Sequence, residues 1–454
     1  MKRIHVFTKK VEKKLYDPGL ANSIHFELSE NGEVTKLNQD YGVLFVKGEV
    51  RPDNGIAARG ALNPYLIKDG ASFLVVCDYV DEAGENMAIG KWYAWKTADF
   101  VEFETVGLID KFDCELSDSI EIPDGISDGI LKRWVAPYGL NVKKAREFSY
   151  PLVRGFADPV VFTWQGKWYF LATNDLNGNI GIFMREASTV DGLFTDEHKL
   201  CVILDYNEEK EFIQTFWAPE WHIIGGVPYI LFAVGGHQWA PHSHMMKYKG
   251  VGDIMDANSW ECPIRVRKKD GSFLCTDGIT LDMTYVKDGG RSYVLWSERY
   301  HINAENDSGS MIYIASVDEK NPTVLTSDKI LLTRPLYGWE NVEGTINNEG
   351  PYCIIRNGKV IVTYSGGAAC GHYYAVGALI ADCGADLLDV SCWKKLQTPF
   401  FNAYTLEGVD GPGHSSFFVD ENGDDMIAFH GQDNGRVSAI HSVYFLADGT
   451  PVVF

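Results

Sequence analysis

One sequence pattern recurs five times in the last two thirds of this chain, and it restricts the possible folds more than any other feature. Each copy has a polar or charged residue, an apolar run, a turn that contains glycine, and a second apolar or aromatic run. Two strands joined by a tight turn produce this pattern. The first copy reads RGFADPVVFTWQGKWYFLATND, and the copies span residues 154–175, 216–236, 279–299, 348–367 and 411–431.

The copies recur at a nearly constant period. Their anchor residues are 62, 62, 67 and 65 positions apart, and they are Asp158, Glu220, Asp282, Glu349 and His414. The register of the second copy is loose by about two residues, whereas the period is not. Further strand-like segments follow the hairpins, so each unit has room for about four strands, which is typical of a propeller blade. We therefore predict an all-β chain in which residues 151–454 form a five-bladed β-propeller.

The first 150 residues have strand and turn signals but do not carry the repeat. Residues 61–80 are predicted to form a hairpin, and residues 90–110 two more strands of the same four-stranded unit. Residues 113–150 have no clear period and are interpreted as an irregular connector. We predict a β-rich N-terminal extension over residues 1–150, and no long helix anywhere, because no segment sustains a 3.6-residue period over three turns.

Composition restricts the partners and the compartment. The 454-residue chain has a formal net charge of −21, which argues against nucleic acid and anionic membranes as partners, since both are polyanions. No apolar run has the length of a membrane span or a signal-peptide core, so we predict a cytoplasmic protein. The nine cysteines include no CxxC pair and are expected to be free, mostly buried thiols.

The predicted geometry gathers the five anchors. In a propeller the first strand of each blade lines the central channel, so equivalent positions of different blades meet at one end of it. Four carboxylates and a histidine in one cavity repel or perturb one another, and such clusters are more often functional than structural. Paired carboxylates suit glycoside hydrolysis, in which one acid protonates the leaving oxygen and one base activates water.

The motifs at these positions resemble those of glycoside hydrolase family 43, the five-bladed arabinofuranosidases, arabinanases and xylosidases. The resemblance covers residues 151–454, the predicted catalytic domain. The matching motifs are Gly155-Phe156-Ala157-Asp158-Pro159, Trp217-Ala218-Pro219, Asp282 with Trp296-Ser297, Glu349-Gly350-Pro351, and Gly411 to His414. Each motif alone is weak, but their order and spacing together are specific.

The resemblance implies roles for individual residues. Asp158 corresponds to the general base, Glu349 to the general acid, and Asp282 to the carboxylate that modulates the pKa of that acid. Trp217 corresponds to a wall of the substrate-binding subsite, and His414 to a channel histidine that orders calcium, in part through water. Because the family inverts the anomeric centre, base and acid are expected to lie about 6.5–9.5 Å apart. No organic cofactor is implied.

Three further sequence features are candidates for a place in or near the site. Glu220 is expected near the site, in contact with sugar hydroxyls. Glu343 is a rival general acid that lacks the Gly-Pro context. The histidines within residues 237–246 are interpreted as a loop at the mouth of the site rather than as a metal centre, because no acidic or thiolate ligands accompany them.

The leading functional hypothesis is an inverting, exo-acting α-L-arabinofuranosidase that cleaves arabinan or arabinoxylan oligosaccharides. A β-xylosidase and an exo-β-1,3-galactanase are alternatives within the same class. A catalytically silent, sugar-binding propeller is the alternative from a different class, and the intact trio Asp158, Asp282 and Glu349 argues against it. The predicted partners are arabinose- or xylose-containing oligosaccharides.

Overall fold

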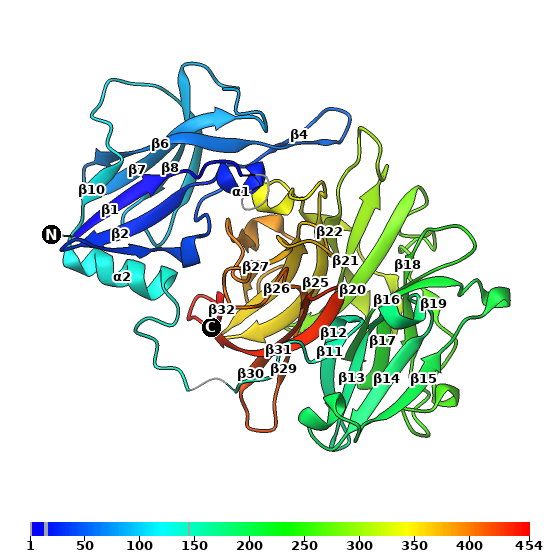
Figure 1. Ribbon diagram of the computed structural model, residues 1–454. Coiled ribbons are helices and arrows are strands. Elements are labelled where there is room, and N and C mark those ends of the chain that lie inside the picture. Colours follow the sequence, from blue (N-terminus) through cyan, green and yellow to red (C-terminus); the bar gives the residue numbers. More distant parts are fainter. Residues whose placement is uncertain (1, 13–16, 144–145) are drawn as a thin grey trace.

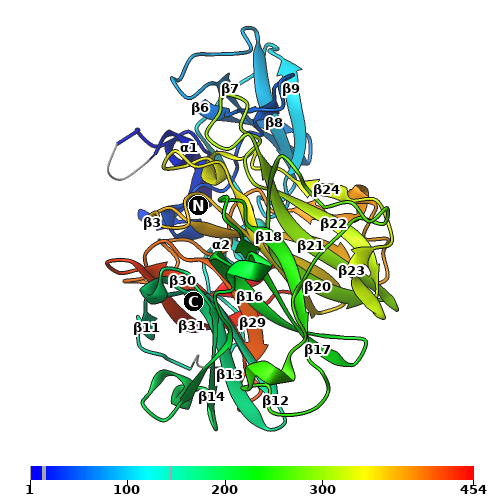
Figure 2. The same ribbon diagram turned by 90° about the vertical axis from the view of Figure 1, so that its right-hand side faces the viewer.

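The computed structural model describes residues 2–12, 17–143 and 146–454. Residue 1, residues 13–16 and residues 144–145, all within the predicted N-terminal extension, lie outside the described part of the chain. Within the described residues no helix is long and apolar enough to cross a membrane. The extension and the repeat region form two lobes, which Figures 1 and 2 show from perpendicular directions.

Residues 153–453 form five antiparallel sheets, and each sheet contains one copy of the repeat. The first consists of β12 (Phe156–Trp164), β13 (Lys167–Asn174), β14 (Ile182–Ala187) and β15 (Lys199–Leu204). The second consists of β16 (Gln214–Ile224), β17 (Val227–Gly235), β18 (His242–Lys247) and β19 (Ile264–Arg265). The third consists of β20 (Gly278–Asp288), β21 (Arg291–Tyr300), β22 (Met311–Asp318), β23 (Asn321–Leu325) and β24 (Ile330–Thr333).

The last two sheets complete the repeat region. The fourth consists of β25 (Asn348–Arg356), β26 (Lys359–Gly366), β27 (Ala375–Asp382) and β28 (Lys394–Lys395). The fifth consists of β29 (Gly413–Val419), β30 (Asp425–Gln432) and β31 (Arg436–Phe445), with β11 (Val153–Arg154) and β32 (Pro451–Val453) both paired to β31. The predicted hairpins are confirmed in all five copies.

The first strands of the five sheets close a ring. Each of β12, β16, β20 and β25 contacts the first strand of the next sheet, and β29 contacts β12 (Figure 1). The ring is also closed through the backbone, because β11, which precedes the first sheet, pairs with β31 of the last. This is the arrangement of a β-propeller, and it brings the starts of the five first strands together.

The N-terminal lobe contains two four-stranded sheets. One has the order β10 (Ser119–Glu121), β1 (Lys2–Phe7), β2 (His25–Glu30), β3 (Glu33–Lys36). The other has the order β6 (Gly60–Asp69), β7 (Ser72–Val80), β8 (Lys91–Thr97), β9 (Glu104–Asp110), which confirms the four-stranded unit predicted from residues 61–110. A short hairpin, β4 (Glu49–Val50) and β5 (Ile56–Ala57), and helix α1 (Pro18–Ala21) complete the lobe.

The prediction of an irregular segment over residues 113–150 is wrong at two places, at strand β10 and at helix α2, which spans Asp124–Trp134. Its apolar residues Ile126, Ile130, Leu131 and Trp134 pack on the N-terminal core at helical spacing. Eleven residues that include two glycines give too short a period to recognise in the sequence. The nine cysteines are all free, as predicted, but only Cys77 and Cys275 are fully buried.

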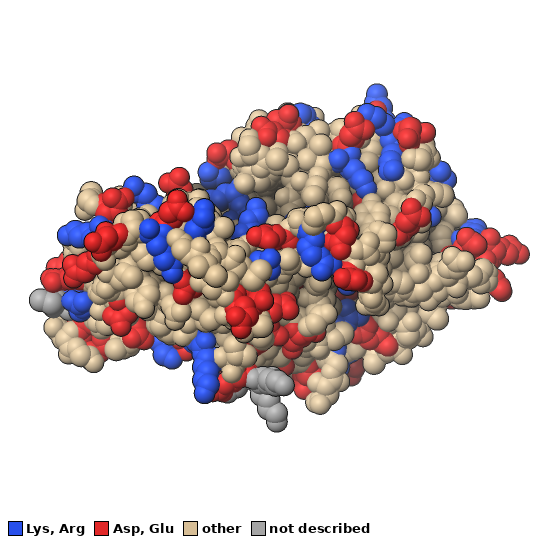
Figure 3. All heavy atoms as spheres, turned by 90° about the horizontal axis from the view of Figure 1, so that it is seen from above, with Lys and Arg blue, Asp and Glu red and all other residues tan. Residues whose placement is uncertain are grey.

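The N-terminal lobe shares a buried core with the propeller. Leu20 and Phe45 belong to the same apolar cluster as Trp339 and Tyr364 of the repeat region. Trp95 of β8 donates a hydrogen bond of 2.9 Å from its indole nitrogen to the side-chain oxygen of Gln397. On the face seen from above in Figure 3, acidic and basic side chains are interspersed over both lobes.

Two glycines bring the backbones of the two lobes close together. A Cβ atom on Gly19 would lie 2.4 Å from the carbonyl oxygen of Gly338, and one on Gly338 would lie 2.2 Å from that of Gly19. Gly338 begins the 3-10 turn η6 (Gly338–Glu340), which faces α1. Both contacts are with backbone atoms, which no side-chain rotation can move away.

We therefore expect Gly19→Ala to lower the free energy of unfolding by about 1–3 kcal/mol, because the two backbones must separate. Chemical denaturation measures this change. Gly125→Ala is the matched control: it lies in α2 with no atom within 4 Å of its Cβ position, so its substitution is expected to be neutral or slightly stabilising. Equal unfolding free energies for the two variants would contradict the close approach.

Candidate active site

Each first strand of the propeller has a β-bulge near its start. The ladder shifts register between Ala157/Val160, Trp217/Glu220, Leu281/Thr284, Glu349/Tyr352 and Gly413/Ser416. One bulged residue in each strand has a left-handed backbone, with φ of 54° at Asp158, 48° at Ala218, 54° at Asp282, 58° at Gly350 and 45° at His414. Bulges of this kind re-aim side chains, and a non-glycine residue with positive φ is held there only by its surroundings.

The bulges define the true structural register of the repeat. Asp158, Asp282 and His414 occupy equivalent positions, as the sequence spacing predicts. The equivalent of Asp158 in the second sheet is Ala218 rather than Glu220, and in the fourth sheet it is Gly350 rather than Glu349. The alignment of the second anchor is therefore corrected by two residues, and that of the fourth by one.

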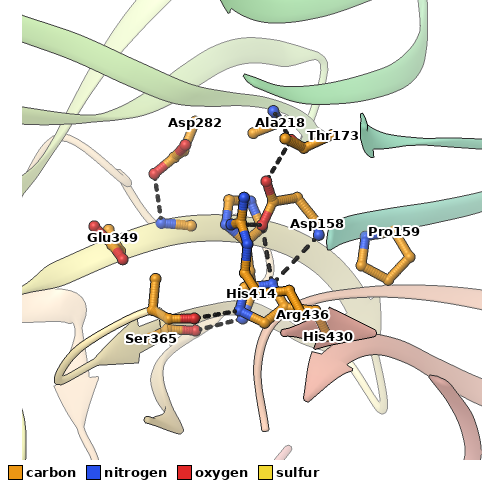
Figure 4. A network of polar contacts seen from close by, with 12 residues as sticks. Asp158, Pro159, Thr173, Ala218, Asp282, Glu349, Ser365, His414, His430 and Arg436 are labelled. Carbon is orange, nitrogen blue, oxygen red and sulfur yellow. Dashed lines mark hydrogen bonds and ion pairs between the residues drawn. The ribbon is translucent and has the colours of Figure 1, made fainter. Parts of the chain in front are cut away.

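Asp158 is buried among cationic and hydrogen-bonding groups (Figure 4). Its Oδ1 lies 3.2 Å from Nδ1 of His414, 3.0 Å from Nδ1 of His430 and 3.6 Å from Nη1 of Arg436. Its Oδ2 accepts a 2.5 Å hydrogen bond from the hydroxyl of Thr173. Four side chains from four different strands thus fix both oxygens of this carboxylate.

These neighbours set the charge state of Asp158. Burial on its own would raise the pKa of this carboxyl group. His414, Arg436 and His430 outweigh burial and hold the pKa well below its ordinary value. Asp158 is therefore an ionised acceptor across the physiological pH range, as a base requires.

Arg436 offers a test of this electrostatic setting. It is held in place by Asp175, whose two oxygens accept hydrogen bonds of 3.0 and 2.7 Å from its guanidinium group. Removing its charge in Arg436→Leu should raise the pKa of Asp158. Since the base works only when ionised, activity is lost as pH falls through that pKa, and the acidic limb of the pH–rate profile should move to higher pH.

The measurement is kcat/KM of an aryl glycoside across the acidic range. Arg356→Leu is the matched control, because Arg356 makes a similar pair with Asp425, at 3.0 and 2.7 Å, on the fourth and fifth sheets away from Asp158. An acidic limb that stays in place in Arg436→Leu would show that this cation does not tune the base.

Glu349 and Asp282 are two further carboxyl groups close to His414 (Figure 4). Glu349 accepts a 3.1 Å hydrogen bond at Oε1 from the hydroxyl of Tyr374. Asp282 Oδ2 accepts hydrogen bonds from the backbone N–H of Gly350, at 3.0 Å, and from the hydroxyl of Ser297, at 3.3 Å. Asp282 thus binds the residue next to Glu349, which places it to orient that glutamate.

The environment of this pair favours protonation. Burial, and then the nearby charge of Asp282, raise the pKa of Glu349 to about 7. Burial also raises the pKa of Asp282, with His414 acting in the opposite direction. The site therefore holds one carboxyl group that is ionised and another that retains its proton near neutral pH. Such a pair is suited to act as base and acid.

Trp217 lies in the second sheet at the position equivalent to Glu349 in the fourth, directly before the bulge. Its ring packs edge-on against Trp239 with 6.3 Å between ring centres, and Trp239 is half exposed. The two rings form one aromatic surface, and the role of Trp217 as a wall of the substrate subsite stays a prediction.

Glu220 lies two residues past the bulge, inside the ring of first strands. It is buried, and its Oε2 lies 2.7 Å from Nε2 of His222. Its charge contributes to the raised pKa of Asp282. Glu220 thus acts electrostatically on Asp282 and His414, and its contact with sugar hydroxyls stays a prediction.

His414 faces Asp158, and the pKa of its imidazole is raised: burial lowers it, but the carboxylates of Asp158, Asp282 and Glu349 outweigh burial. Among the residues that the structure describes, no three His, Cys, Asp or Glu side chains are arranged to hold a metal ion. Calcium requires 6–8 oxygen ligands. These ligands include backbone carbonyl oxygens and water, so a calcium ion ordered at His414 stays a prediction.

The rival residues have other contacts. Glu343 is exposed, and its carboxylate accepts hydrogen bonds from the backbone N–H groups of His372 and Tyr373. His242 and His244 belong to strand β18, so the loop predicted over residues 237–246 ends at residue 241. His244 stacks on Phe232 in the core of the second sheet.

Four residues of the site were not among the predicted ones: Thr173, Tyr374, His430 and Arg436. They lie on second and third strands or just before one, whereas the sequence search followed only the first strand of each copy. Of these four residues, His430 has a signal in the local sequence, because it lies in Phe429-His430-Gly431 at the end of the fifth repeat.

Comparison with known proteins agrees with this site. The sequence profile of glycosyl hydrolases family 43 matches residues 148–451, and the chain belongs to this family. Alpha-L-arabinofuranosidase B of Pyricularia oryzae is 33% identical over 322 residues, which are 67% of this chain and 62% of that protein. An extracellular exo-alpha-(1->5)-L-arabinofuranosidase of Streptomyces chartreusis is 33% identical over 293 residues, which are 62% of this chain and 82% of that protein.

The fold comparison gives the same family. The crystal structure of alpha-L-arabinofuranosidase from Lactobacillus brevis superposes with a TM-score of 0.58 at 28% identity, over 67% of this chain and 95% of that one. The chain spans less than two thirds of the length of the Pyricularia relative. The N-terminal lobe lies outside the region that the family profile matches.

Proposed function

We propose that this protein is an inverting, exo-acting α-L-arabinofuranosidase that cleaves arabinan or arabinoxylan oligosaccharides. One observation carries the chemical part of the proposal: Asp158 and Glu349 lie around the same histidine, His414, and their surroundings move their pKa values in opposite directions. Asp158 then removes a proton from the attacking water, and Glu349 protonates the departing oxygen. Asp282 holds the backbone beside the acid.

The choice of sugar rests on the relatives. The Pyricularia and Streptomyces proteins are both named arabinofuranosidases, and the second name specifies exo action on α-1,5 linkages. The cytoplasmic location, the calcium ion held through water at His414, and the absence of nucleic-acid and membrane partners remain predictions from the sequence. They form part of this proposal without further support.

A panel of aryl glycosides tests the proposal. We expect hydrolysis of the aryl α-L-arabinofuranoside, with the released sugar first detected by proton NMR as the inverted anomer. Preferential cleavage of the aryl β-xyloside or β-galactoside would favour a β-xylosidase or an exo-β-1,3-galactanase instead. Binding of arabino-oligosaccharides by calorimetry without cleavage of any member would identify a silent binding propeller.

Exo action needs a separate measurement. Products released from a linear arabino-oligosaccharide should be arabinose and a chain one unit shorter at every early time point. A mixture of internal fragments at early times would contradict exo action while leaving the catalytic assignment intact.

A further inference from the structure

Tyr374, one residue before β27, is fully buried next to the proposed acid. Its hydroxyl donates a hydrogen bond of 3.1 Å to Oε1 of Glu349. We propose that Tyr374 is a positioning residue that keeps the proton of Glu349 on Oε2, the oxygen that delivers it to the leaving group. This inference rests on the proposed role of Glu349 as general acid.

The reason lies in the chemistry of a neutral carboxyl group. It has one carbonyl oxygen, which is the better acceptor, and one hydroxyl oxygen, which carries the proton. A hydrogen bond donated to Oε1 makes that oxygen the carbonyl and leaves the proton on Oε2. When the Oε2–H bond breaks, the proton forms an O–H bond with the glycosidic oxygen, and the electron pair of the breaking C–O bond stays on that oxygen. The phenol keeps its own proton and stabilises the new carboxylate.

The direction of the Tyr374 hydrogen bond is set by its neighbours. The backbone N–H of His414 donates to Oγ of Ser365 at 2.7 Å. The serine oxygen is the acceptor in this bond, so its hydroxyl proton is left for another acceptor. The Ser365 side chain also acts to lower the pKa of Tyr374, against the larger effect of burial, as a hydroxyl that donates toward the phenol oxygen does. With the serine hydroxyl as donor, the phenol oxygen acts as acceptor, and its own proton is directed to Glu349. Ser365 lies on β26 directly opposite Glu349 in the sheet register.

The Tyr374 ring is packed against a histidine and a glycine. It stacks on His430 with 5.3 Å between ring centres and 11° between ring planes. Gly413 also lies against the ring, since a Cβ atom there would be 2.0 Å from two ring carbons. This contact accounts for the glycine that precedes His414 in the fifth motif. Because His430 also contacts Asp158 at 3.0 Å, one stack of rings links the positions of base and acid.

The experiment compares leaving groups in the full-length protein. With phenyl arabinofuranoside, whose poor leaving group needs protonation, Tyr374→Phe is expected to lower kcat about 10- to 100-fold, the effect of losing a hydrogen bond to a charged group. With 2,4-dinitrophenyl arabinofuranoside, which leaves without protonation, kcat should stay close to that of the unmodified protein. Ser365→Ala, which removes the second link of the chain, should give a smaller effect in the same direction.

The pH profile gives an independent readout. The Tyr374 hydrogen bond lowers the pKa of Glu349, against the larger effects of burial and Asp282 that raise it. Its loss should raise that pKa further. Since the acid works only when protonated, activity falls as pH rises through its pKa, and the alkaline limb of Tyr374→Phe should move to higher pH.

Tyr364→Phe is the matched control. Tyr364 lies in the same sheet, is equally buried, and donates a hydrogen bond of 2.9 Å to Glu340, a buried glutamate outside the site. Its loss should change thermal stability without changing leaving-group dependence. If Tyr374→Phe loses activity equally on both substrates and keeps its alkaline limb, the positioning role is wrong. If Glu349→Gln shows no leaving-group dependence, the acid assignment itself fails, which separates the two results.

Discussion

Replacing Glu349 with glutamine is expected to lower kcat/KM about 10²- to 10⁴-fold on substrates with poor leaving groups, because the amide has no proton to transfer. The side chain keeps its shape, and Tyr374 can still donate to the amide oxygen. With an activated aryl arabinofuranoside the loss should be much smaller. This dependence on the leaving group is the signature of a lost general acid.

The pH profile of this variant should change in a defined way. The pKa of Glu349 is raised to about 7, so the unmodified protein should lose activity as pH rises through that value and the acid loses its proton. Glu349→Gln, measured with the activated substrate, should lack this alkaline limb. Kinetics across the neutral and alkaline range measure the effect.

Glu343→Gln is the control for this prediction. Glu343 is the other glutamate near the fourth repeat. It is exposed, its carboxylate accepts hydrogen bonds from the backbone N–H groups of His372 and Tyr373, and its own backbone N–H donates to Asp17. Its variant should retain the leaving-group dependence and the alkaline limb of the unmodified protein. The acid would have to be reassigned to Glu343 if the two variants behaved in the opposite way.

Asp158→Asn is expected to lower kcat/KM about 10²- to 10⁴-fold on every substrate, whatever its leaving group. Water must be activated in the same step in which the sugar departs, so an activated leaving group does not replace the base. Asparagine is the suitable substitution because it tolerates the left-handed backbone at this position, where φ is 54°. With its amide oxygen in the place of Oδ2, asparagine can also still accept the hydrogen bond from Thr173.

Loss of the charge should be separated from loss of the fold. The variant leaves His414, His430 and Arg436 without their central carboxylate, so some loss of stability is expected along with the loss of activity. Asp288→Asn is a matched control, a buried aspartate at the far end of the strand that carries Asp282. Unimpaired hydrolysis by a folded Asp158→Asn protein would exclude Asp158 as the base.

The five hairpins were predictable because their signals are local. Alternating apolar runs and turn residues specify two strands within about 20 residues, and the period then implies equivalent positions. Asp158, Asp282 and the dipeptide before Pro351 could be found in this way. Helix α2 could not, because its short apolar face is interrupted by glycines.

The register of the second sheet shows where local signals end. Glu220 is a charged residue at nearly the right spacing, yet Ala218 occupies the bulge and Glu220 follows it by two residues. A bulge adds one unpaired residue to a strand, and many residue types can occupy it. The sequence therefore does not show that Ala218, rather than Glu220, takes this position.

The sequence by itself thus determined that five similar β-units follow one another and which carboxyl groups begin the first, third and fourth of them. Only the tertiary structure decided the charge state of each carboxyl group and the neighbours that orient it. His430 and Arg436 reach Asp158 from more than 270 positions away, and Tyr374 reaches Glu349 from the far side of a hairpin. The physical reason is that charge state depends on burial and on neighbours in space, and closing the ring of strands is what brings those neighbours together.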